Sequence, residues 1–173
     1  VMKVLVIGTG NMGAGFVKQL VTAGHQVSVT ARDQAKARSL AQQFGAVAVA
    51  SADSATSVDA IVLATPYAEA VAALRAVGEL TGKTVIDITN PLTPDYTGLT
   101  LGHNTSAAEE IAKAVPGAEV VKGFNTVFAQ LLADGADFGG GQKVTVFVAS
   151  DSERAKQTAR ALAESMGFRV MDS

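Results

Sequence analysis

The segment KVLVIGTGNMGAG at residues 3–15 constrains the fold of this chain more than any other. Its uninterrupted apolar run at residues 4–7 is typical of a strand buried on both faces, as in a parallel sheet. The run enters a G-x-G-x-x-G turn that opens a helix, whose free N–H groups favour phosphate. This context predicts a dinucleotide site, and the alternative is a glycine-rich turn without a ligand. The predicted contacts are Gly8, Thr9, Gly10, Asn11, Met12 and Gly13.

Apolar runs and helical segments alternate along the rest of the chain. Further strands are expected at residues 26–30, 46–50, 60–64, 84–88, 119–124, 143–149 and 168–171. Helices are expected at residues 12–23, 34–44, 67–80, 107–115 and 127–132, and one capped by Ser150 and Glu153 continues through residue 166. Because βαβ crossovers are right-handed, this alternation predicts an α/β fold with a doubly wound, mostly parallel sheet.

The end of the second predicted strand selects between two cofactors. A carboxylate at this place in a Rossmann fold accepts hydrogen bonds from the adenosine ribose of NAD, but the position holds Ala31. The guanidinium of Arg32 suits a 2′-phosphate, and Thr30 offers a hydroxyl, so the pattern favours NADP. In the alternative, Asp33 binds the ribose, although we expect Asp33 to cap the helix that follows it. Residues 1–173 are therefore expected to form a single NADP-binding Rossmann domain.

Three later strand ends are also expected beside the cofactor, since open α/β sheets bind ligands outside the carboxyl ends of their strands. The turn of Ala64, Thr65 and Pro66 is expected near the adenosine half or the linking ribose. Asn90 and Pro91 are expected to border the nicotinamide, and Asn125 faces the same crevice. The alternative for Asp87 and Asn90 is a local hydrogen bond to the backbone of the turn.

Composition excludes several classes of function. A net charge of −2 gives no broad attraction to nucleic acid or to an anionic membrane. The absence of cysteine removes thiolate catalysis and sulfur-ligated metals, and it is compatible with a cytoplasmic location. The sequence shows no metal-ligand spacing and no apolar run of membrane length. The two histidines, His25 and His103, are not tied to a nucleophile, so no catalytic residue is predicted.

Several of these residues together resemble a known family. Residues 7–13, Gly24 with His25, Arg32 and above all VKGFNTVFA at residues 121–129 are similar to the NADP-dependent coenzyme F420 reductases. The resemblance covers nearly the whole chain and implies hydride transfer between NADPH and a deazaflavin or flavin-like ring. It also implies that residues 9–12 bind the pyrophosphate and that Thr30 and Arg32 bind the 2′-phosphate. The end of the strand at residues 60–64, Asn90 with Pro91, and Asn125 with Thr126 would lie around the nicotinamide.

Members of this family usually continue past the final strand into a helical portion that helps to build the acceptor pocket, whereas this sequence ends at Ser173. We therefore expect loops or a second subunit to complete the pocket, and we expect a homodimer. The membrane ferric reductases carry a similar domain, so a flavin or a metal chelate is an alternative acceptor to coenzyme F420. Two other functions stay open, a non-catalytic NADP(H)-binding module and the cofactor domain of a longer imine- or hydroxyacid-type dehydrogenase.

Overall fold

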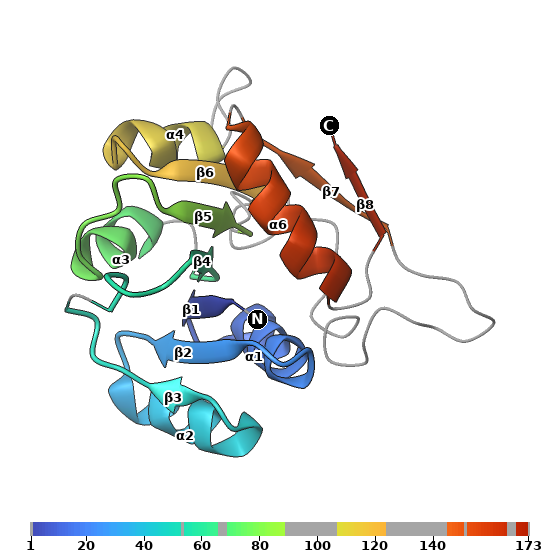
Figure 1. The fold of residues 1–173 in the computed structure, drawn as a ribbon. Coiled ribbons are helices and arrows are strands. Elements are labelled where there is room, and N and C mark those ends of the chain that lie inside the picture. The colour runs from blue at the N-terminus through green and yellow to red at the C-terminus, as the bar shows by residue number, and fades with distance from the viewer. Residues whose placement is uncertain are drawn as a thin grey trace, which may run out of the picture.

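The computed structural model describes residues 2–52, 54–65, 69–88, 107–123, 145–150, 152–165 and 169–172. Over these residues, eight strands form one sheet that is flanked by helices (Figure 1). The strands are β1 (Lys3–Ile7), β2 (Gln26–Thr30), β3 (Val47–Ala48), β4 (Ala60–Leu63), β5 (Thr84–Asp87), β6 (Glu119–Gly123), β7 (Thr145–Ala149) and β8 (Arg169–Asp172). The helices are α1 (Asn11–Thr22), α2 (Gln34–Phe44), α3 (Ala70–Ala76), α4 (Ala107–Ala114) and α6 (Glu153–Ser165).

The strands are arranged in the order β3-β2-β1-β4-β5-β6-β7-β8. The strands from β3 to β6 in this order are parallel, β7 runs antiparallel to β6, and β8 runs parallel to β7. The predicted doubly wound, mostly parallel sheet is therefore confirmed. The order of its parallel part is the order found in dinucleotide-binding folds.

In-register pairing brings the last residues of four neighbouring strands to one edge of the sheet. Ile7 pairs with Thr30 on one side and with Leu63 on the other. Leu63 in turn pairs with Asp87. The ends of β2, β1, β4 and β5 therefore lie level, and the connections that follow them leave from the same side. We call this side the carboxyl edge.

Helices cover both faces of the sheet, which explains the uninterrupted apolar runs in the sequence. Val4 and Val6 of β1 face a core built with α1, α2 and α6. Leu5 and Ile7 face a second core built with α3 and α4. Figure 1 shows α3 and α4 on one side of the strands and α1 and α6 on the other. Both cores hold β1 in place, so the turn after it has a rigid support.

Some predicted boundaries differ from the structure. The helix predicted at residues 67–80 is shorter, because α3 spans only Ala70–Ala76 and Gly78 follows with a φ of 109°. A left-handed glycine at this place ends the helix. The strand predicted at residues 46–50 is reduced to Val47–Ala48, which lies at the end of the sheet beside a single strand. The helix predicted at residues 127–132 lies outside the described residues.

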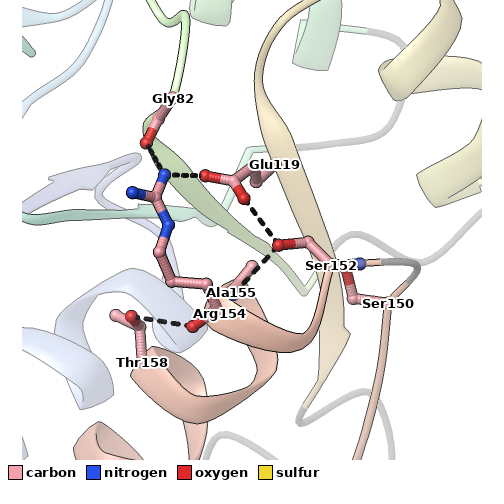
Figure 2. A network of polar contacts seen from close by, with 7 residues as sticks. All are labelled: Gly82, Glu119, Ser150, Ser152, Arg154, Ala155 and Thr158. Carbon is pink, nitrogen blue, oxygen red and sulfur yellow. Dashed lines mark hydrogen bonds and ion pairs between the residues drawn. The ribbon is translucent and has the colours of Figure 1, made fainter.

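A polar network fastens α6 to the amino-terminal side of the sheet (Figure 2). The hydroxyl of Ser152, rather than that of the predicted Ser150, accepts a hydrogen bond of 3.1 Å from the first turn of α6. The same hydroxyl donates to Glu119 Oε1 at 2.6 Å. Arg154 forms an ion pair with the other oxygen of Glu119 and donates to the carbonyl oxygen of Gly82 at 2.7 Å. Because Glu119 begins β6, the network lies opposite the carboxyl edge and we assign it a structural role.

Candidate functional site

The turn after β1 is held between the ends of β2 and β4. The N–H of Gly8 donates to the carbonyl oxygen of Thr30 at 2.9 Å, and Gly8 has a φ of 117°, which only glycine adopts readily. A Cβ at Gly8 would lie 2.6 Å from the carbonyl oxygen of Ala64. The turn therefore needs glycine both for its backbone angle and for the close approach of β4.

Gly13 is required by the contact between α1 and the same turn. A Cβ at Gly13 would lie 2.3 Å from the carbonyl oxygen of Gly8. No Cβ in a folded protein tolerates that distance, so the helix can begin this close to β1 only with glycine here. Because α1 begins this close to the end of β1, its N-terminus lies at the carboxyl edge.

The N-terminus of α1 is open and carries no side-chain cap. Gly10 is its N-cap residue in an extended conformation, with no side-chain hydrogen bond and no acidic residue in the first turn. A Cβ at Gly10 would meet no atom of the described residues within 4 Å, so this part of the structure leaves open space in front of the helix. The first N–H groups of a helix lack intrahelical acceptors and carry partial positive charge. The backbone of Gly10, Asn11 and Met12 therefore forms a cradle that fits a pyrophosphate.

Thr65 adds an uncompensated polar atom beside this cradle. Its hydroxyl oxygen is buried and has no hydrogen-bond partner among the described residues. A Cβ at Gly8 would lie 3.3 Å from the backbone nitrogen of Thr65, so the backbone of this residue borders the glycine turn. Buried hydroxyls in native proteins are nearly always paired. A ligand would pair with this oxygen only after the Thr65 side chain rotates toward the surface, because the oxygen has no exposed surface in this structure. The fit to a dinucleotide therefore rests on the cradle.

Thr30 is placed differently from what we expected. The residue is fully buried, and its hydroxyl oxygen lies 3.0 Å from Ser51 Oγ. A residue without exposed surface does not reach a phosphate, which corrects the expectation of a direct contact. Thr30 instead supports the turn through the hydrogen bond that its carbonyl accepts from Gly8.

Asp33 caps α2, as predicted. Its Oδ1 accepts hydrogen bonds from the backbone N–H groups of Ala35 at 3.0 Å and Lys36 at 3.2 Å. One carboxylate oxygen is thereby committed to the helix, which weakens the alternative in which Asp33 binds a ribose. Ala31 is half-buried and its carbonyl accepts a hydrogen bond of 2.7 Å from the Gln34 side chain.

Arg32 projects into solvent at the end of β2. Its side chain is 85% exposed, and it forms an ion pair with Glu69, whose side chain is 35% exposed. Glu69 directly precedes α3 and belongs to the connection that follows β4. Sequence reasoning missed Glu69, because a position 37 residues beyond Arg32 carries no local signal of this contact.

The other predicted contacts are placed only in part. Ala64 and Thr65 lie at the end of β4, where the N–H of Ala64 donates to the carbonyl oxygen of Ile7 at 2.9 Å. Asp87 ends β5 and is fully buried. The expectations for Pro66, Asn90, Pro91 and Asn125 lie outside the described residues, as does the side-chain placement of Asn11 and Met12.

The histidine of the described residues lies away from the cradle. His25 is at the amino-terminal end of β2, where its Nδ1 accepts a hydrogen bond of 3.0 Å from the N–H of Met2. Partial burial lowers the pKa of His25 below its ordinary value of 6.5. No group of three or more His, Asp or Glu side chains in the described ranges is arranged to hold a metal ion. Across those ranges, no helix has the length and hydropathy to cross a membrane.

Comparison with known proteins agrees with this geometry. The family described as "NADP oxidoreductase coenzyme F420-dependent" matches residues 3–91, just over half of the chain. The F420-dependent NADP reductase of Methanothermobacter marburgensis is 31% identical, over 99% of this chain and 83% of that protein. The metalloreductase STEAP3 of Rattus norvegicus is 29% identical over 98% of this chain, which spans only 33% of that longer protein.

Solved structures show the same relationship. A protein from Arthrobacter sp. FB24, described as a candidate F420-dependent NADP reductase, superposes with a TM-score of 0.86 and 32% identity. The match covers 99% of this chain and 84% of that one. An imine reductase from Pseudomonas sp. superposes with a TM-score of 0.70 at 21% identity, which shows a shared fold alone. From the family match and the near full-length similarity to a reductase, the chain belongs to the coenzyme F420-dependent NADP oxidoreductase family.

Proposed function

We propose that this protein binds NADP(H) at the carboxyl edge and transfers hydride between NADPH and coenzyme F420 or a flavin-like ring. The observation that carries the proposal is the N-terminus of α1 at Gly10, which meets no atom of the described residues in front of it and lies at the same carboxyl edge as the exposed Arg32. A helix terminus and a guanidinium at this edge match the pyrophosphate and the 2′-phosphate of one dinucleotide. The nicotinamide ring of the bound cofactor supplies the hydride.

Each part of the site has a distinct task in this proposal. The backbone of residues 8–13 holds the pyrophosphate, Arg32 binds the 2′-phosphate, and the Thr65 hydroxyl bonds to a ribose or phosphate oxygen. Pro66, Asn90, Pro91 and Asn125 are proposed contacts on the nicotinamide side. The chain would act as one domain over residues 1–173, as a homodimer in the cytoplasm.

Hydride transfer between two aromatic rings makes small demands on side-chain chemistry. It requires that the donor carbon be held against the acceptor carbon while water is excluded, and such positioning contributes roughly 7–11 kcal/mol to lowering a barrier. A site built mainly from backbone N–H groups, one hydroxyl and one guanidinium is consistent with this demand. The described residues of the site accordingly bind and orient the cofactor, and we assign none of them as an acid or a base.

The acceptor is proposed from two sources. The first source is the family's description, which names coenzyme F420. Two relatives named F420-dependent NADP reductase support it, and this chain matches 83% and 81% of their lengths. The second source is the rat relative, which is named a metalloreductase. A flavin and a ferric chelate are therefore the next acceptors to test. A deazaflavin and a flavin present similar fused rings to the nicotinamide, so the same cofactor geometry serves both.

The test is NADPH oxidation followed by its absorbance, with coenzyme F420, FMN, FAD and ferric citrate offered separately as acceptors. NADPH binding is measured in parallel by calorimetry on the same preparation. The proposal predicts binding together with turnover of at least one ring acceptor. Binding without turnover of any acceptor would contradict the reductase proposal and support a non-catalytic NADP(H)-binding module. Absence of NADPH binding would contradict both.

A further inference from the structure

The Arg32–Glu69 ion pair spans the end of the strand that carries the glycine turn. Arg32 follows β2, and Glu69 belongs to the connection between β4 and α3. Since β2 and β4 flank β1 in the sheet, the pair joins the two connections on either side of the cradle. A carboxylate oxygen therefore lies within ion-pair distance of the guanidinium that we propose for the 2′-phosphate.

This ion pair has little value for folding. The Arg32 side chain is 85% exposed, and exposed pairs contribute little to stability because water and salt screen them. A phosphate dianion binds a guanidinium more strongly than a single carboxylate does, since it carries more charge and accepts two parallel hydrogen bonds. A 2′-phosphate can thus displace Glu69, but the displaced carboxylate stays close to the bound dianion.

We propose that Glu69 is a specificity-determining residue that moderates the preference for NADPH over NADH. This inference rests on the proposed function of Arg32. In the complex with NADPH, Glu69 both competes for Arg32 and repels the 2′-phosphate. In the complex with NADH, the ribose 2′-hydroxyl is a hydrogen-bond donor, and the carboxylate accepts from it while its ion pair with Arg32 is kept. One carboxylate therefore disfavours one cofactor and favours the other.

The experiment is calorimetric titration of Glu69→Gln with NADPH, NADH and 2′,5′-ADP, a probe that carries the 2′-phosphate without the nicotinamide. We expect the Kd values of NADPH and 2′,5′-ADP to fall about three- to tenfold at low salt, because a like charge several ångströms away is removed. The Kd of NADH should stay unchanged or rise. Raising the salt to about 1 M shortens the Debye length to about 3 Å and should shrink the gain.

Glu153→Gln is the matched control. Glu153 is also an exposed carboxylate in an ion pair, with Lys156 at 3.5 Å, and its substitution changes the net charge of the protein equally. It lies on α6 beside the network opposite the carboxyl edge, so it should leave all three Kd values unchanged. Equal shifts for both variants would show a net-charge effect and overturn the role of Glu69.

Arg32→Ala distinguishes a failure of the proposed 2′-phosphate site from a failure of the inference on Glu69. If Arg32→Ala leaves NADPH affinity unchanged, the placement of the 2′-phosphate on Arg32 is wrong and the proposed function of this residue fails. If Arg32→Ala weakens NADPH while Glu69→Gln shifts NADPH and NADH by the same factor or not at all, only the inference on Glu69 is overturned. Thermal unfolding of each variant verifies that these exposed substitutions leave the fold intact.

Discussion

At the residue scale, Gly10 and Gly13 are both motif glycines but meet different surroundings. A Cβ at Gly13 would overlap the Gly8 carbonyl at 2.3 Å, whereas a Cβ at Gly10 would meet no described atom within 4 Å. Gly13→Ala should therefore lower the free energy of unfolding by about 1–3 kcal/mol and abolish NADPH binding. Gly10→Ala should cost less than about 1 kcal/mol of stability and still weaken NADPH, because its methyl group occupies the approach to the pyrophosphate.

The two glycine variants are compared by urea unfolding and by calorimetric titration with NADPH. Parallel losses of stability and affinity in both variants would contradict the distinction between packing and ligand approach. Gly10→Ala with unchanged affinity would show that the space in front of α1 is not the phosphate site.

Thr65 gives a second test at the residue scale. Its buried hydroxyl has no partner among the described residues, so Thr65→Val removes an uncompensated polar atom at nearly constant volume. Stability without ligand should stay equal or rise by up to about 1 kcal/mol, while NADPH affinity should fall about three- to tenfold through loss of a ligand hydrogen bond. Thermal unfolding with and without NADPH measures both effects. A variant that is destabilised without ligand and binds NADPH normally would show that the hydroxyl is paired inside the protein.

At the scale of elements, the cap of α6 fastens this helix to the start of β6. The hydrogen bond from Ser152, followed by Arg154, lowers the pKa of Glu119 below its ordinary value. A lowered carboxyl pKa contributes stability above the unfolded value of 4.5 that is lost as the pH falls through the folded pKa. Ser152→Ala removes the cap of α6 and should lower the free energy of unfolding by about 0.5–2 kcal/mol. Because Ser152 also holds down the pKa of Glu119, the variant should lose part of the acid sensitivity.

The control is Ser39→Ala, on the exposed side of α2, which should leave stability nearly unchanged. NADPH affinity should stay the same in both serine variants, because the network lies opposite the carboxyl edge. A loss of NADPH affinity in Ser152→Ala would contradict the structural role assigned to this network.

His25 couples the start of β2 to the end of α6. Its Nδ1 accepts from the Met2 N–H, so the ring is neutral with its hydrogen on Nε2, which lies 2.8 Å from Ser165 Oγ. Because burial lowers the folded pKa below 6.5, the unfolded state binds a proton first as the pH falls. The stabilising contribution is complete above 6.5 and is lost as the pH falls through the folded pKa.

We expect wild-type stability to decrease more steeply than that of His25→Gln as the pH falls below 6.5, a change measured by urea unfolding at each pH. Carboxyl groups titrate in both proteins and cancel in the comparison. Equal slopes would contradict the neutral, hydrogen-bonded state of His25.

At the scale of the whole molecule, the alternation of strands and helices and the glycine turn could be predicted because their signals are local. The apolar run of β1, the Gly8–Gly13 spacing and the Asp33 cap each depend on neighbouring residues. The placement of Thr30 could not be predicted, since its hydroxyl pairs with Ser51 in another connection. Glu69 was missed for the same reason, because only the fold brings the connection after β4 to the end of β2. The end of α3 was also predicted wrongly. The sequence pattern extended this helix to residue 80, whereas Gly78 ends it earlier.

The central claim is that one edge of the sheet holds NADP(H), with the pyrophosphate on α1 and the 2′-phosphate on Arg32. A crystal structure of the complex with NADP⁺ tests it most directly. We predict hydrogen bonds from the backbone N–H groups at the start of α1 to the pyrophosphate, and an Arg32 guanidinium that has left Glu69 for the 2′-phosphate. A pyrophosphate bound away from α1, or a 2′-phosphate that points into solvent while Arg32 stays paired with Glu69, would contradict it.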